Sequence, residues 1–110
     1  MVKTRKPIWM KLKNAETEQI EQLLGPHFQR VDAYRVNSAS IRVRVVDEKF
    51  DGLSERARDR SVEKYFKQLR KEISNDIMVL LTMTPAELDD TPVTMNGCLN
   101  YDFENPPTDL

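Results

Sequence analysis

The sequence contains very little cysteine, histidine or glycine. Its 110 residues include one cysteine, one histidine and three glycines. A single cysteine excludes an intrachain disulfide. A catalytic Cys–His pair would have to bring Cys98 and His27 together from distant parts of the chain, and their spacing matches no known metal-ligand pattern. We therefore expect a protein that is not an enzyme and that has no metal site and no cofactor.

Long apolar runs are also absent, and basic residues interrupt the N-terminal segment. This pattern does not fit a signal peptide or a membrane-spanning helix, so we expect a cytoplasmic protein with no membrane partner. A chain of 110 residues favours a single domain with a modest core. Hydrophobic residues make up 39% and charged residues 32% of the sequence, and this balance is typical of a soluble globular domain.

Charge is unevenly distributed, although the formal net charge is only −1. Residues 1–14 contain lysine and arginine but no acid, whereas the chain beyond Glu72 contains acids but no lysine or arginine. Pro7 disfavours a helix near the start because its ring fixes φ and it lacks an amide hydrogen. We therefore predict a basic, extended N-terminal arm (1–14), a folded domain (15–90) and an acidic C-terminal tail (91–110).

Both terminal segments carry aromatic residues. We expect Trp9 to fold back onto the edge of the domain core, although a lone aromatic among lysines could also anchor at a partner. We expect the tail to be irregular, and either packed through Tyr101 and Phe103 or mobile.

The first half of the domain predicts a helix followed by a β-hairpin. Residues 15–24 carry apolar side chains at helical spacing, and the Gly-Pro pair that follows them ends a helix. Residues 27–36 are strand-like, and residues 39–47 alternate between apolar β-branched residues and arginines. A short polar turn between the two segments indicates antiparallel pairing. The alternation places Arg42 and Arg44 on the sheet face opposite to the apolar side chains.

The second half predicts a crossover helix, a strand and a short closing helix. Ser54 is suited to cap a helix that extends to about Ser74. Residues 76–83 are apolar and predict a strand buried on both faces, and Thr84-Pro85 opens the closing helix. The core-facing stripe of the crossover helix consists of Val62, Tyr65, Phe66, Leu69 and Ile73.

The predicted element order is therefore α-β-β-α-β-α. A helix between the second and third strands favours a right-handed crossover and parallel pairing of those strands. The fold class is α/β (α+β): a small domain with a three-stranded mixed sheet and helices packed on one face.

Three motifs in this order resemble one family. Residues 45–54 resemble the second strand and the "F-x-G-x-S" turn of BolA-like proteins, the stress-induced morphogen type. Residues 58–62 resemble their "R-H-R-x-V" helix, and residues 80–87 resemble their third strand and closing "L-K-T-L-T-P-E-E". With the first helix and strand, the resemblance covers roughly residues 16–88. It implies a fold similar to a type II KH domain.

The resemblance also implies partners. BolA-like proteins pair with monothiol glutaredoxins and help to hold a [2Fe–2S] cluster, and some members are described as DNA-binding regulators. The position of the family's cluster-binding histidine matches Asp76, the loop at residues 37–40 offers neither cysteine nor histidine, and the "R-H-R" histidine matches Asp59. Such clusters require thiolate or imidazole ligands, and a carboxylate is a poor replacement. We therefore expect a module that lacks the cluster ligand. A monothiol glutaredoxin-like protein is an alternative partner that the resemblance implies.

Two functional hypotheses follow. The first is a BolA-like regulatory module that binds a protein partner through the sheet edge and through Phe50, Gly52, Ser54 and Arg58. The alternative is a nucleic-acid-binding transcriptional regulator, without the G-x-x-G loop that RNA-binding KH domains use. Its basic surface would consist of Arg42, Arg44, Arg56, Arg60, Lys64, Lys67 and Lys71.

Overall fold

The computed structural model describes residues 7–89 and 95–107. The strands form one three-stranded sheet in the order β1-β2-β3, in which β1 and β2 are antiparallel and β2 and β3 are parallel. The mixed sheet predicted from the sequence is therefore confirmed. The elements, in chain order, are α1 (Ile8–Lys11), α2 (Ala15–Leu24), β1 (Arg30–Asn37), β2 (Ser40–Val46), η1 (Glu48–Phe50), α3 (Glu55–Glu63), η2 (Phe66–Gln68), α4 (Lys71–Ser74), β3 (Ile77–Met83), α5 (Pro85–Leu88) and α6 (Met95–Glu104).

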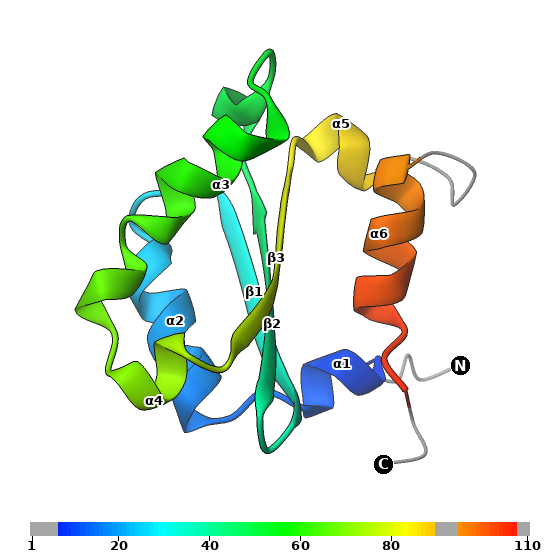
Figure 1. Ribbon diagram of the computed structural model, residues 1–110. Helices are drawn as coiled ribbons and strands as arrows, with labels where there is room; N and C mark the ends of the chain where they lie inside the picture. Colours follow the sequence, from blue (N-terminus) through cyan, green and yellow to red (C-terminus); the bar gives the residue numbers. More distant parts are fainter. Residues whose placement is uncertain (1–6, 90–94, 108–110) are drawn as a thin grey trace.

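Helices cover both faces of this sheet, as Figure 1 shows. The helices α2, α3 and α4 lie on one face, called the front here, and α1 and α6 lie on the other, called the back. The expectation of helices on a single face was therefore wrong. It failed because both terminal segments, expected to be an extended arm and an irregular tail, contain helices that pack against the sheet.

The helix starts are specified locally. Asn14 accepts a hydrogen bond from the Thr17 amide at 3.0 Å, and the Thr17 hydroxyl accepts one from the Asn14 amide, so α2 begins with a capping box. Ser54 caps α3 by accepting a hydrogen bond from the Ala57 amide. Thr84 caps α5 with proline at its first position. The caps predicted at Ser54 and Thr84 are confirmed.

The crossover segment is not one helix. The helix α3 ends at Glu63, a 3₁₀ turn occupies Phe66–Gln68, and Leu69 has an extended backbone before α4 starts. The break lets Val62 and Ile73 both reach the front core, where each is fully buried. The prediction of a continuous helix to Ser74 was wrong, although the apolar stripe does face the core.

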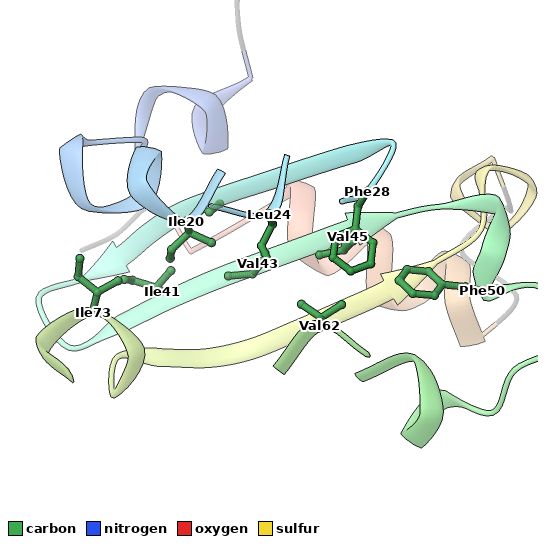
Figure 2. Close-up of a cluster of buried hydrophobic side chains, with 10 residues drawn as sticks. Ile20, Leu24, Phe28, Ile41, Val43, Val45, Phe50, Val62 and Ile73 are labelled. Carbon is green, nitrogen blue, oxygen red and sulfur yellow. The ribbon is translucent and has the colours of Figure 1, made fainter. Parts of the chain in front are cut away.

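The front core lies between β2 and the helices α2 and α3. Figure 2 shows its side chains over one face of the sheet. Phe28 and Phe50 pack with their ring centroids 5.8 Å apart, and Phe28 also meets Tyr65 edge to face. The buried members are Ile20, Leu24, Phe28, Ala33, Ile41, Val43, Val45, Phe50, Val62 and Ile73.

A second core lies on the back of the sheet. Trp9 from α1 and Phe103 from α6 pack at 5.6 Å between ring centroids, and both contact Tyr34 of β1. The expected return of Trp9 to the domain is confirmed, because it is 2% exposed. In the tail, Phe103 is buried but Tyr101 is exposed. Residues 1–6, 90–94 and 108–110, which the sequence assigned to the arm and the end of the domain and tail, lie outside the described residues.

The strand β3 is less buried than expected. Its C-terminal half is buried, but Met78 is 63% and Val79 is 41% exposed. A register shift leaves Met78 between the paired positions Ile77 and Val79. The prediction of burial on both faces was therefore wrong for the first half of the strand. Among the described residues, no helix is long and apolar enough to cross a membrane.

Candidate partner-binding site

The turn between β2 and α3 presents its central residues to solvent. Gly52 has φ 78°, a left-handed conformation that glycine adopts without steric cost, and both Gly52 and Ser54 are exposed. Leu53 between them is 43% exposed. Phe50 is fully buried in the front core, so its predicted role as a contact residue was wrong: its ring anchors the turn from below.

Arg58 holds this turn against α5. Its guanidinium donates to the Glu87 carboxylate at 2.6 Å, and its Nε donates to the Leu53 carbonyl at 3.1 Å. Burial by itself would raise the pKa of Glu87, but the hydrogen bonds and charge of Arg58 and the Thr84 amide outweigh it and lower that pKa. Arg58 therefore sits beside the turn, as expected, but already has a partner within the chain.

Asp76 occupies an ion-pair network at the opposite end of the sheet. Its carboxylate accepts a hydrogen bond from Arg35 at 2.9 Å, and the same guanidinium bonds Glu16 at 2.9 Å. Arg35 also donates to the carbonyls of Asn37 and Ser38 in the hairpin loop. Among the described residues, no three His, Cys, Asp or Glu side chains are grouped to hold a metal ion.

Two of the predicted basic residues point into the back layer. Arg44 is fully buried and bonds Asp32 at 2.9 Å, Asn100 at 2.6 Å and Glu104 at 2.6 Å. Arg42 donates to the Tyr34 hydroxyl and to a carbonyl of α6. The prediction that Arg44 offers its charge to a nucleic acid was wrong, because α6 covers this face of the sheet.

The remaining basic residues do not form one stripe. Arg56 and Arg60 are exposed on α3, whereas the lysines follow after the helix has ended, at its C-cap, in η2 and in α4. All five side chains are exposed, but they belong to differently oriented segments. The single helical stripe inferred from their spacing was therefore wrong; its five members are Arg56, Arg60, Lys64, Lys67 and Lys71.

The two residues considered for a catalytic pair lie on different sides of the sheet. His27 is exposed and stacks on Tyr65 with 4.3 Å between ring centroids, next to the front core. Cys98 is exposed on α6, which covers the back. The fold therefore keeps the chain's only histidine and its only cysteine apart.

Sequence reasoning missed the groove along the outer edge of β3. A cavity of about 110 Å³ opens beside Val79 and Leu81, with Leu99 and Phe103 of α6 in its lining. On the front side Asp59 of α3 reaches β3 and accepts a hydrogen bond from the Thr82 hydroxyl at 2.9 Å. The apolar run of β3 was visible in the sequence, but the groove depends on α6, which the sequence pattern did not predict.

The structure resembles two solved BolA structures. No family model and no curated protein matches the sequence. BolA1 from Arabidopsis thaliana superimposes with a TM-score of 0.52 at 16% identity, and the likeness covers 68% of this chain and 98% of that chain. The BolA domain of SufE1 from Arabidopsis thaliana superimposes with a TM-score of 0.54 at 17% identity and the same coverage. These likenesses confirm the resemblance suggested by the sequence motifs, and they show that the chain has a BolA-like fold.

Proposed function

We propose that this chain is a non-enzymatic binding or regulatory module of the BolA type, located in the cytoplasm, that acts through a protein partner. The observation that carries the proposal is the exposure of apolar side chains at two places, the β2–α3 turn and the β3 edge. Leu53 in the turn is 43% exposed, and Met78 and Val79 near the start of β3 are 63% and 41% exposed. Exposed apolar side chains on an otherwise charged surface favour a protein-binding role.

The proposed module works without the family's iron–sulfur ligand. The carboxylate of Asp76 offers oxygen donors and is engaged by the Arg35 guanidinium. The hairpin loop at residues 37–40 contains no cysteine or histidine. A [2Fe–2S] cluster needs thiolate or imidazole ligands, so this donor set does not fit it.

The nucleic-acid alternative has less support. Its two strand arginines are engaged by side chains and carbonyls of the back layer. The exposed Arg56 and Arg60 share a shallow hollow of α3 with Glu55, Asp59 and Glu63, whose charges oppose theirs. Phosphate binding depends on clustered cations, so we expect only weak DNA binding that falls steeply with salt.

A comparison of surface variants tests the protein-partner proposal. The full chain is used to capture proteins from an extract of its source organism, followed by cross-linking and mass spectrometry. Leu53→Asp is expected to reduce recovery of a specific partner about tenfold, because it places a charge in the proposed contact. Ile8→Asp is the control, because Ile8 is 48% exposed on α1, outside the proposed surface. The absence of a specific partner, together with tight DNA binding at physiological salt, would contradict the proposal.

The iron question has a direct test. The chain is co-expressed with a monothiol glutaredoxin, and any complex of the two is isolated and its visible spectrum recorded. We expect no cluster that is shared between the two proteins. A stable heteromeric complex with iron–sulfur absorption would overturn the interpretation of Asp76.

A further inference from the structure

The outer edge of β3 has the features of a site for an added strand. The strand pairs with β2 on one side, and no described strand pairs with its other side. Figure 1 shows the sheet edge-on, with α3 on one side of β3 and α6 on the other. Proteins usually protect such an edge with charge, a covering segment or irregularity, because its backbone groups can pair with another chain. The strand β3 itself contains no charged residue, and its irregularity is at Met78.

The two sides of this edge differ in character. On the back side, the cavity of about 110 Å³ is lined by apolar side chains of Val79, Leu81, Leu99 and Phe103, next to Arg42, Glu55 and Asp102. That arginine is already engaged by the Tyr34 hydroxyl and by Asp102. The back side of the groove therefore suits apolar side chains.

The front side of the edge is acidic. Glu55, Asp59 and Glu63 recur every four residues and therefore share one side of α3. Asp59 and Glu63 line a hollow together with Met78 and other residues of β3, and Glu55 borders the cavity on the α6 side. Among the ion pairs of the described residues, none includes any of these three carboxylates.

Asp59 has a further reason to accept a cation. Burial raises its pKa, and the neighbouring charge of Glu63 raises it further, against the opposing effects of the Thr82 hydrogen bond and Arg58. A lysine or arginine placed over Asp59 would compensate this desolvated carboxylate. Arg56 and Arg60 border the same carboxylates on α3, but the hollow at β3 is lined by Asp59 and Glu63 without a basic residue. The charges that face β3 thus complement a basic partner.

We propose that the β3 edge binds an extended basic segment of a partner protein as a fourth strand. Its main chain pairs with β3, its lysine or arginine side chains face Asp59 and Glu63, and its apolar side chains, alternating with them, face Val79 and Leu99. Successive side chains of a strand point to opposite sides, which matches the acidic and apolar sides of this groove. This inference rests on the proposed function and specifies the chemistry of the partner.

A second copy of the chain is a poorer occupant. Antiparallel pairing of two β3 edges would continue the sheet and place both α3 helices on the same face. The acidic row of one copy would then lie near that of the other, and like charges at short range are unfavourable. Self-association through this edge is therefore an outcome that the experiment must detect.

The test uses the full chain and a capped eight-residue peptide that alternates lysine and valine. Binding is followed by titration of the amide resonances of the ¹⁵N-labelled protein. We expect the largest shifts in residues 77–83 and 55–63. A peptide that alternates glutamate and valine should not bind. A lysine–valine peptide with N-methyl groups at every second residue should bind at least about tenfold more weakly, because it keeps the charge but loses hydrogen bonds along one edge.

A matched pair of variants tests the charge. Glu63→Lys should weaken binding about five- to tenfold, because it reverses one member of the acidic row. This change is favourable for α3 itself, since Glu63 is in the last turn of the helix, where a cation suits the dipole. Glu72→Lys makes the same substitution at an exposed position in α4 and should leave the affinity unchanged.

The proposal is overturned if the peptide causes no shifts, if the shifts lie away from β3, or if the N-methylated peptide binds equally well. It is also overturned if the β3 resonances change with protein concentration alone, because a second copy would then occupy the edge. If a partner is captured from extract but cross-links only at the Gly52–Ser54 turn, this strand proposal fails and the proposed function stands. If no partner is captured and DNA binds tightly at physiological salt, the proposed function fails whatever the peptide does.

Discussion

Arg44 is a cation whose charge is balanced inside the protein. Its guanidinium lies between Asp32 and Glu104 and stacks over the rings of Trp9 and Phe103, at 5.1 and 4.7 Å from their centroids. The side chain is fully buried, so water does not compensate any bond that is lost. The residue thus connects β2 to both terminal helices.

Arg44→Ala should therefore lower the free energy of unfolding by about 3 kcal/mol. It leaves Asp32, which is 8% exposed, with only the weaker compensation of Arg30 and Lys13. Urea denaturation measures the change. The control Arg56→Ala removes an exposed arginine and should cost less than about 0.5 kcal/mol. Equal losses in the two variants would show that the buried network contributes nothing specific.

Asp59 should make the free energy of unfolding decrease as pH rises, which is the opposite of the usual effect of a carboxylate. Burial raises its pKa above the ordinary value of 3.8, so the folded protein holds this proton more tightly than the unfolded chain. The resulting stabilisation is complete below the ordinary value and is lost as pH rises through the raised pKa. Asp59→Asn keeps an oxygen for the Thr82 hydroxyl and has no charge to bury. Its stability relative to wild type should increase between pH 3 and pH 7 in urea titrations; a decrease would contradict the assignment.

The alternation of β2 correctly separated Arg42 and Arg44 from the apolar side chains, but it could not show what covers their face. Period two assigns a residue to a side of the sheet and says nothing about the element beyond it. The covering helix α6 has no strong helical signal of its own, since it contains Gly97 and two asparagines. The burial of Arg44 therefore became visible only with the tertiary structure.

At the level of elements, α5 begins with a capping box whose Glu87 carboxylate also accepts a hydrogen bond from Arg58. Glu87 accepts a hydrogen bond from the Thr84 amide at 2.8 Å, while the Thr84 hydroxyl accepts one from the Glu87 amide at 3.2 Å. The Arg58 guanidinium then joins the box to α3 at 2.6 Å. One carboxylate thus fixes the entry to α5 and the distance between two helices.

Glu87→Gln should cost about 1–2 kcal/mol at pH 7, because a neutral amide replaces a charge-assisted bond to Arg58. The pKa of Glu87 is lowered from its ordinary value of 4.5, so the wild-type advantage exists above that value and is lost as pH falls through the lowered pKa. Chemical denaturation at pH 7 and pH 3 should therefore show a difference that shrinks in acid. A difference that persists unchanged in acid would mean that the charge of Glu87 is unimportant.

Elements with local signals were predictable, and those defined by tertiary contacts were not. The helix Ala15–Leu24 agrees with the predicted range because its apolar spacing and following Gly-Pro pair are local. No glycine or proline lies near Glu63, so the sequence does not predict the break in the helix there. It arises because the chain must turn to bring Ile73 into the front core and β3 beside β2. The turn at Gly52 and the helix cap at Ser54 were predicted from their motif, whereas the β3 groove required knowledge of α6.

For the molecule as a whole, the sheet separates two cores that share β2. Val43 and Val45 belong to the front core, whereas Val46 belongs to the back core. A structural change in either core therefore involves the shared strand β2. This coupling favours one cooperative unit in place of a BolA-like domain with loosely attached ends.

The single tryptophan reports on this coupling, because Trp9 is buried in the back core against Tyr34 and Phe103. Trp9 fluorescence and far-ultraviolet circular dichroism should give the same urea midpoint if both layers unfold together. Phe103→Ala should lower both midpoints equally and cost about 3–4 kcal/mol, because it opens a cavity beside the tryptophan. If fluorescence changes at lower urea while the dichroism of the sheet and front helices persists, the back layer is a separate unit, and it would then leave Arg44 open to a partner.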